Sequence, residues 1–395
     1  MRQIKQFGLI AALAVLLSGC SIFVKEEITY KLLQPIDAKV QPKVVWKANV
    51  GNGVRHYFSH LNPVVVGDTL VAADRDGIVM AIDRNTGKTQ WRLDLRSEIG
   101  QQASTWWRKG EPFRIAGGLT AADGIVYLGT ENGDLVALEA ATGAIKWHQS
   151  IRAEVLSDPA VGGGMVYITG ATGEVLALDQ ATGEPLWRNT TETPSLSLRG
   201  TASPTYAQGG VFVGTAGGKL IVLVAENGQP AWETRLAIPT GTTELHRLVD
   251  VDTQPIISGR VVYAVAYNGA LVSIDAASGQ IIWRRDYSSY QNLLHVSGRL
   301  FLTDVEDSVS ALDAQGGIEI WSNNDYTGRH LTAPVRFKDY IVVGDRHGYL
   351  HFINILTGVT EGRLEVGDDV YTAPVVADDT LYVQLRDGTL LAVRM

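Results

Sequence analysis

One pattern recurs along most of the chain and constrains its fold more than any other feature. A run of alternating apolar residues ends at an acidic residue, a Thr-Gly pair or a similar turn follows, and a second short run ends at a tryptophan. The repeats are spaced about 40 to 56 residues apart, which is typical of a β-propeller. Copies occupy residues 77–91, 133–147, 173–187, 218–232, 269–283 and 308–321, and a degenerate copy at 348–362 lacks the tryptophan.

Each repeat supplies enough strands for one blade. The alternating apolar run favours a strand, the Thr-Gly pair favours a turn with positive φ, and the tryptophan run gives a second strand. Another pair of strands precedes this hairpin, as residues 64–73 illustrate. Four antiparallel strands per repeat are the composition of a propeller blade.

The two ends of the chain supply complementary parts of one further blade. Residues 44–46 form a tryptophan strand without a preceding hairpin, and residues 388–394 form the hairpin half without its tryptophan strand. Pairing these segments removes two open strand edges and closes the ring. We therefore expect an all-β, eight-bladed β-propeller whose N- and C-terminal strands share one four-stranded blade.

The repeated tryptophans and aspartates are interpreted as structural. A large aromatic side chain at the same place in every repeat is best explained by packing between blades. The aspartates before the turns recur too evenly for a single active site, and we expect them to cap those turns. They are Asp83, Asp179, Asp275 and Asp313.

The first twenty residues are similar to a bacterial lipoprotein signal. Arg2 and Lys5 precede an apolar run at residues 7–17, and the sequence Leu-Ser-Gly-Cys ends at Cys20. The run is too short to cross a bilayer of about 30 Å as a helix. We expect cleavage before Cys20 and lipid attachment to it, although an ordinary secretory signal with an incidental cysteine is the alternative. Ser21 follows the cysteine and, by the same resemblance, indicates the outer membrane.

Composition and domain boundaries follow from these features. We expect a signal peptide at residues 1–19, a lipid-anchored tether at 20–43 and the propeller at 44–395. Cys20 is the only cysteine among the 395 residues, which excludes an intrachain disulfide and a cysteine-rich metal site. A net charge of -8 argues against nucleic-acid binding, which needs a basic surface.

Two segments depart from the repeat and are the candidates for partner binding, because loops carry the function of a scaffold. In residues 193–200, an extended backbone would place Leu196 and Leu198 on one side and Arg199 on the other. The alternative is that the leucines fold under the loop. In residues 241–255, Asp250 and Asp252 share one side and would meet an arginine or a backbone donor of a partner, or else cap the loop.

The two departing segments resemble the signature loops of the BamB family. The resemblance rests on Pro-Ser-Leu-Ser-Leu-Arg-Gly at 194–200, Arg-Leu-x-Asp-Val-Asp-Thr at 247–253, and a further match at 343–351. It implies a non-catalytic, periplasm-facing lipoprotein of the outer-membrane barrel-assembly (BAM) machinery that binds a POTRA domain of BamA. Direct contact with unfolded outer-membrane protein clients stays open.

The resemblance also implies roles for individual residues. Leu196, Leu198 and Arg199 match the partner-binding loop of the family, and Asp250 and Asp252 match its neighbouring acidic pair. His246 departs from the acidic residue of the family at that place. The insert around Trp106 and Trp107 is another candidate surface, although a loop packed over one blade edge is preferred.

Two other functions compete with this assignment. The repeat resembles that of quinoprotein dehydrogenases, which bind pyrroloquinoline quinone, but a lone cysteine cannot form the disulfide common in their sites. A propeller that binds a different envelope protein is the second alternative. His347 and His351 on one strand would stand about 13 Å apart, too far to share a metal ion. We therefore assign no catalytic residue, metal or cofactor.

Overall fold

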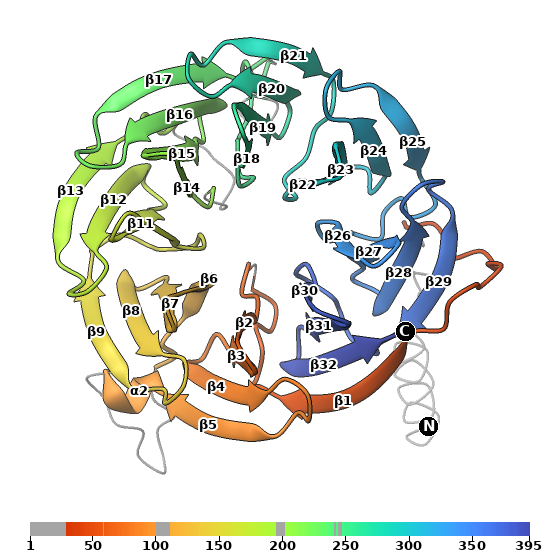
Figure 1. Ribbon diagram of the computed structural model, residues 1–395, viewed down its shortest axis with the longest axis horizontal. Helices are drawn as coiled ribbons and strands as arrows, with labels where there is room; N and C mark the ends of the chain where they lie inside the picture. The colour runs from red at the N-terminus through yellow and green to blue at the C-terminus, as the bar shows by residue number, and fades with distance from the viewer. Residues whose placement is uncertain (1–28, 58, 100–110, 195–201, 241, 244–246) are drawn as a thin grey trace, which may run out of the picture.

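The computed structural model describes residues 29–57, 59–99, 111–194, 202–240, 242–243 and 247–395. These residues form eight four-stranded antiparallel sheets arranged as blades in a ring (Figure 1). The predicted eight-bladed β-propeller is confirmed. One short helix, α2 (Leu95–Glu98), follows the first complete blade. None of the helices in the described part of the chain is long and apolar enough to cross a membrane.

We number the blades in chain order and give the strands of each from the centre of the ring outward. Blade 1 contains β2 (Val64–Val66), β3 (Thr69–Ala73), β4 (Ile78–Asp83) and β5 (Thr89–Asp94); blade 2 contains β6 (Ile115–Ala122), β7 (Ile125–Thr130), β8 (Asp134–Glu139) and β9 (Ile145–Ser150). Blade 3 contains β10 (Ala160–Gly162), β11 (Met165–Thr169), β12 (Glu174–Asp179) and β13 (Pro185–Thr190); blade 4 contains β14 (Thr205–Ala207), β15 (Gly210–Gly214), β16 (Lys219–Val224) and β17 (Pro230–Arg235).

The second half of the ring repeats this order. Blade 5 contains β18 (Ile256–Ser258), β19 (Val261–Val265), β20 (Leu271–Asp275) and β21 (Ile281–Arg285); blade 6 contains β22 (Leu294–Val296), β23 (Arg299–Thr303), β24 (Val309–Asp313) and β25 (Glu319–Asn323). Blade 7 contains β26 (Val335–Phe337), β27 (Tyr340–Gly344), β28 (Tyr349–Asn354) and β29 (Thr360–Glu365); blade 8 contains β30 (Val375–Ala377), β31 (Thr380–Gln384), β32 (Thr389–Arg394) and β1 (Lys43–Asn49).

Blade 8 is built from both ends of the chain, as expected. The first strand, β1, pairs antiparallel with the last strand, β32, with Lys43 opposite Arg394 and Asn49 opposite Thr389. This pairing uses the strand edges that each terminus would otherwise leave open. The ring is therefore closed by backbone hydrogen bonds between its two ends.

The core lies between the blades. The two middle strands of each blade are buried on both faces, so they are almost continuously apolar, whereas the outer strands alternate in exposure. One core cluster, for example, joins Val71 and Val79 of blade 1 to Val126 and Val136 of blade 2. Because each cluster has two blades as its walls, a blade is stabilised mainly by its neighbours.

The repeated tryptophans connect neighbouring blades, as predicted. The indole of Trp91 in blade 1 donates a hydrogen bond of 2.9 Å to the carbonyl of Ala140 in blade 2. Gly143, in the same turn of blade 2, lies so close that an added Cβ would be 2.7 Å from the indole. The same donation to the next blade is made by Trp46, Trp147, Trp187, Trp232, Trp283 and Trp321.

The repeated aspartates cap the turns, also as predicted. Oδ1 of Asp83 accepts hydrogen bonds from the backbone amides of Asn85 and Thr86 and from the Thr86 hydroxyl. These bonds hold the pKa of the Asp83 carboxyl below its ordinary value. The turn aspartates Asp179, Asp275 and Asp313 make corresponding bonds.

The segments between successive blades all reach one face of the ring, which we call the loop face. There, in seven of the eight blades, the segment that enters the blade pairs with the turn between the second and third strands of that blade. In blade 7, for example, the amide of Arg346 donates to the carbonyl of Arg329. The other bonds of this kind join Arg75 to Gly53, Glu131 to Arg114, Ala171 to Glu154, Tyr267 to Asp250, Val305 to Ser288 and Arg386 to Asp369. The turns between the third and fourth strands, against which the tryptophans pack, lie on the opposite face.

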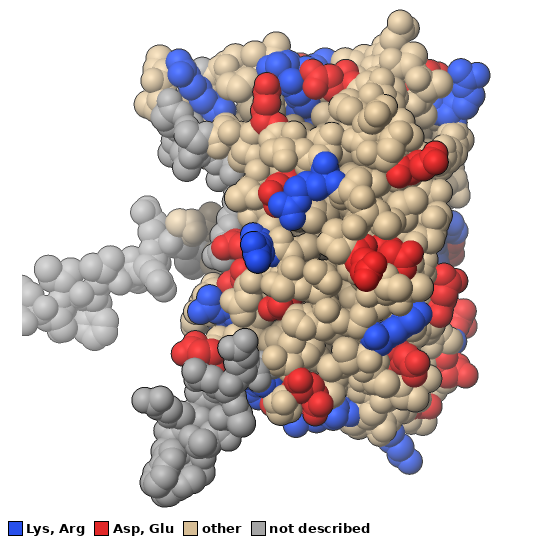
Figure 2. Space-filling view, turned by 90° about the vertical axis from the view of Figure 1, so that its left-hand side faces the viewer, with Lys and Arg blue, Asp and Glu red and all other residues tan. Residues whose placement is uncertain are grey.

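The outer wall of the ring carries charges of both signs. Figure 2 views the wall on the side of β9 and β13, where acidic and basic side chains are interspersed among uncharged ones. Neither sign forms a continuous patch on this side.

Candidate functional site

Several predicted site residues lie outside the described residues. They are Leu196, Leu198 and Arg199 of the partner loop, the lipidation site Cys20, and also His246, Trp106 and Trp107. The structure does describe both ends of the partner loop. Thr191–Pro194 leave β13 of blade 3, and Ala202–Pro204 lead into β14 of blade 4.

The two ends of the partner loop are fixed to blade 3 by side-chain hydrogen bonds. The hydroxyl of Thr191 donates to the carbonyl of Gly173 at 2.9 Å, and that of Thr193 donates to Thr172 at 3.0 Å. At the other end, the carbonyl of Ala202 accepts a bond of 2.7 Å from the Thr169 hydroxyl. The loop therefore starts and ends on a rigid support.

The second predicted segment is held against blades 4 and 5. The amide of Tyr267 donates to the carbonyl of Asp250 at 2.7 Å, and the amide of Val251 donates to Thr215 at 3.2 Å. Val249 and Val251 pack into the core between these blades. Asp250 itself is only 2% exposed, so its side chain lies beneath the surface of the free protein.

Asp252 is partly buried and differs from Asp250 in its surroundings. Its Oδ1 atom is buried and has no hydrogen-bond partner among the described residues. Burial raises the pKa of the Asp252 carboxyl to about 7, because the charged form loses hydration. A hydrogen-bond donor that reached this carboxyl would favour its charged form.

The two predicted segments meet at one place on the loop face. A hollow between blades 3 and 4 is lined by residues from both ends of the partner loop and by the acidic segment. Its lining includes Thr191, Thr193, Ala202, Thr215 and Asp250. The structure thus brings the stems of the partner loop together with Asp250, although some 50 residues separate them in the sequence.

Two positioning residues were not recognised in the sequence. The side-chain amide of Asn268 donates to the carbonyl of Leu248 at 2.8 Å, and Arg284 donates to the carbonyl of Leu236 at 2.7 Å. Both bonds hold the connection from β17 to β18, in which Asp250 lies. The pair Asn268-Gly269 is a turn signal that indicates Asn268, which has a φ of 48°. Nothing in the pattern around Arg284 indicates its role.

The two histidines of blade 7 lie in different surroundings. His351 is fully buried and its Nε2 lies 2.9 Å from Oδ2 of Asp345. His347 lies at the surface. Within the described part of the chain, no group of three or more His, Cys, Asp or Glu side chains is placed to hold a metal ion.

The comparisons with known protein sequences identify one family. A family model described as outer membrane protein assembly factor BamB matches residues 37–107, 75–323 and 305–394. The chain is 39% identical to the outer membrane protein assembly factor BamB of Escherichia coli (strain K12), over 99% of both chains. It is 43% identical to that of Shewanella oneidensis, over 96% of both.

Solved structures agree on the fold. The crystal structure of BamB from Moraxella catarrhalis has a TM-score of 0.79 and 26% sequence identity, covering 90% of this chain and 100% of that chain. The quinohemoprotein alcohol dehydrogenase of Comamonas testosteroni has a TM-score of 0.67 at 16% identity, covering 89% and 76%. At that identity the second similarity concerns the fold alone.

Proposed function

The chain belongs to the family of the outer membrane protein assembly factor BamB, and from that premise we propose that its loop face docks on a periplasmic POTRA domain of BamA. Its role in the barrel-assembly machinery is that of an assembly factor for outer membrane proteins, without catalysis. The two curated relatives named above are both outer membrane protein assembly factors. The similarity to quinone-dependent enzymes is limited to the fold and is no evidence that this chain shares their catalytic activity.

The observation that carries this proposal is the meeting of the partner-loop stems with the Asp250 segment at one hollow. Stems fixed by hydrogen bonds reduce the conformational entropy that the loop loses on binding. Leu196 and Leu198 would supply apolar contact area and Arg199 a charge-assisted hydrogen bond. Because Asp250 is buried, we assign it a positioning role, and we assign contact with a partner donor to Asp252.

We further propose that a lipid on Cys20 holds the protein at the periplasmic side of the outer membrane. In this arrangement residues 1–19 are removed as a signal peptide, and the segment that begins at Cys20 joins the lipid to the propeller. More than one acyl chain is needed for stable anchoring, since each buried methylene contributes about 0.8 kcal/mol. Mass spectrometry of the purified protein tests the expected modification of Cys20.

The docking proposal is tested by measuring the affinity of the purified protein for the periplasmic region of BamA. The variant L196A/L198A/R199A should bind at least about 30-fold more weakly, which corresponds to about 2 kcal/mol. A matched control is L186A/L356A/R336A, because these three residues are exposed and lie away from the loop face. The control should bind like the unmodified protein.

Equal affinities for the unmodified protein and the L196A/L198A/R199A variant would contradict the proposed site. Circular dichroism and thermal unfolding of each variant check that the fold is retained. Affinity purification from solubilised membranes then distinguishes BamA from another envelope partner. If a different protein is retained by the unmodified chain and lost from the variant, the loop face is a docking site but BamA is not its partner.

A further inference from the structure

The segment at residues 29–42, before the first strand, lies against the propeller and is here called the N-terminal strap. It runs along the outside of blades 6 and 7, beside β29 (Figure 1). The amide of Lys31 donates to the carbonyl of Thr327 at 2.8 Å, and the amides of Lys39 and Val40 donate to Glu361 at 2.8 and 3.2 Å. The strap is thus attached through its backbone at both ends.

One end of the strap replaces a missing tryptophan. Blade 7 has Gly362 at the register position where the other blades have tryptophan, opposite Phe352 of β28. Val40 occupies the vacated space, since a Cβ on Gly362 would lie 2.5 Å from Cγ2 of Val40. Beside it, the Lys39 ammonium lies 2.6 Å from the carboxylate of Glu361. The strap therefore completes the packing of blade 7.

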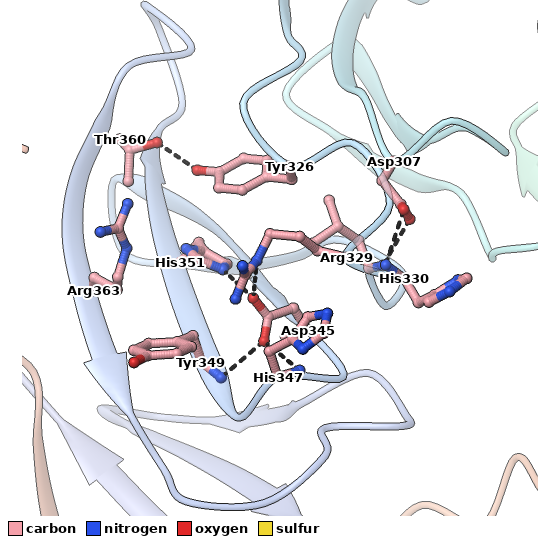
Figure 3. Close-up of polar contacts among 12 residues, drawn as sticks. Asp307, Tyr326, Arg329, His330, Asp345, His347, Tyr349, His351, Thr360 and Arg363 are labelled. Carbon is pink, nitrogen blue, oxygen red and sulfur yellow. Dashed lines mark hydrogen bonds and ion pairs between the residues drawn. The ribbon is translucent and has the colours of Figure 1, made fainter. Parts of the chain in front are cut away.

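The other end of the strap rests on a rigid polar platform in blade 7. The ring of Tyr30 lies 3.9 Å from that of His347, and the guanidinium of Arg329 lies 5.4 Å from the Tyr30 ring. Arg329 is buried and its Nε donates to Asp345 at 2.6 Å. Asp345 also bonds His351, so the platform is held by a connected network (Figure 3).

The two ends of the strap lie at opposite faces of the ring. Arg329 and His347 belong to the loop face, because one precedes β26 and the other lies in the turn between β27 and β28. From Tyr30 the strap descends to Pro42 and enters β1 at Lys43, which pairs with Arg394 at the far end of β32. The chain that precedes Thr29 therefore joins the propeller at the loop face.

We propose that the strap turns the loop face toward the membrane, so that the partner is held between the propeller and the lipid surface. This inference rests on the proposed lipid at Cys20. The nine positions from Cys20 to Thr29 span at most about 30 Å, at 3.3 to 3.6 Å each. A domain of about 70 residues has a radius of gyration near 11 Å and hence a diameter of about 28 Å. The distance between the loop face and the membrane therefore fits one domain of that size.

The orientation is tested by energy transfer on lipid vesicles. The lipidated protein is bound to vesicles of phosphatidylethanolamine and phosphatidylglycerol that contain an acceptor dye on the headgroups. A donor dye is attached to one introduced cysteine, Glu306→Cys on the loop face or Gln315→Cys on the opposite face; both positions are exposed and flank β24. We expect clearly stronger transfer from position 306. Equal transfer, or stronger transfer from position 315, would overturn the orientation.

Strap variants show whether the strap causes this asymmetry. In Y30A, and more completely in Y30A/K39A/V40G, the difference in transfer between positions 306 and 315 should shrink. Leu32→Ala is the matched control, because Leu32 lies in the strap but is 57% exposed, and it should keep the difference. Y30A leaves Val40 in place, so this single variant still tests the role of the strap if the triple variant fails to fold. A difference that persists in folded Y30A and triple variants would contradict the role of the strap.

The same lipidated protein in detergent separates this inference from the docking proposal. Its affinity for the periplasmic region of BamA should be unaffected by Y30A, because the partner loop is untouched. Normal affinity combined with equal transfer from both faces would reject the orientation alone. If the unmodified protein does not bind the periplasmic region of BamA but shows the expected difference in transfer, only the proposed partner is rejected.

Discussion

The indole nitrogen of Trp46 donates a hydrogen bond of 3.0 Å to the carbonyl oxygen of Arg84, which ties the blade shared by the two termini to blade 1. Trp46→Ala should lower the free energy of unfolding by about 3 kcal/mol, because it removes both this bond and the ring packed against blade 1. Trp46→Phe keeps an aromatic ring and should cost about 1 kcal/mol. Chemical denaturation followed by fluorescence and circular dichroism measures both. Equal stability of Trp46→Ala and the unmodified protein would contradict the assigned role.

The glycine beneath Trp46 is expected to be more sensitive than a glycine in an open turn. Gly87 has a φ of 74°, and an added Cβ would lie 2.8 Å from the indole. Gly124 has a φ of 78° with no atom within 4 Å of an added Cβ. Gly124→Ala should therefore cost only the strain of positive φ, about 1–2 kcal/mol. Gly87→Ala should cost more, and thermal unfolding of both variants measures the difference.

The stability of the protein is expected to depend on pH through Asp252. Its pKa is raised from 3.8 to about 7, so the folded protein binds more protons than the unfolded chain between these values. The stability contributed by this group is therefore present below pH 4 and is lost as the pH rises toward 7. Asp252→Asn should stabilise the protein at pH 8, by an amount on the order of 2 kcal/mol, and should have little effect at pH 4.

Two other aspartates serve as controls for this pH dependence. Burial raises the pKa of Asp158 to about 6, so the gain from Asp158→Asn should be complete at a lower pH than that from Asp252→Asn. The pKa of Asp83 is lowered by its bonds to Thr86, so Asp83→Asn should destabilise the protein at neutral pH. Unfolding curves measured from pH 4 to 8 separate the three cases. A gain from Asp252→Asn that does not vary with pH would contradict the assignment.

Arg284 should control the local stability of the segment that carries Asp250. Its guanidinium donates to the carbonyl of Leu236, which lies directly after β17. Arg284→Ala should increase hydrogen exchange in residues 236–253 by several-fold, while exchange in blades 1 and 2 stays unchanged. Arg260→Ala is a suitable control, because the Arg260 side chain is exposed and, among the described residues, bonds only Asp275 in blade 5. Equal exchange in the two variants would remove the positioning role of Arg284.

Much of the fold could be predicted because its signals are local. The alternation before each turn, the glycine after it and the tryptophan that follows are read within about 15 residues, and they recur in each repeat. Ring closure was also accessible, since residues 44–46 and 388–394 are complementary halves. The strand edges that they would leave open are a general liability of sheets.

Features that depend on contacts between distant segments could not be predicted. Alternation placed Asp250 and Asp252 on one side, but the bridge from Asp250 to Tyr267 buries only the first of them deeply. The composition of residues 20–43 predicted a tether, whereas from Thr29 onward the chain lies on blades 6 and 7. The sequence showed that blade 7 lacks a tryptophan but not that Val40 takes its place. The partner roles of Leu196, Leu198 and Arg199 stay predictions.

The pairing of β1 with β32 also determines the order in which the molecule can be finished. A chain that emerges with its N-terminus first must leave β1 without its sheet partner until residues 389–394 have appeared. Only the last segment of the chain can form the backbone hydrogen bonds that β1 lacks. A chain truncated by a few residues therefore cannot close the ring. Synthesis must therefore be complete before this protein reaches its native state, and an unfinished copy keeps an open strand edge that exposes it to proteolysis.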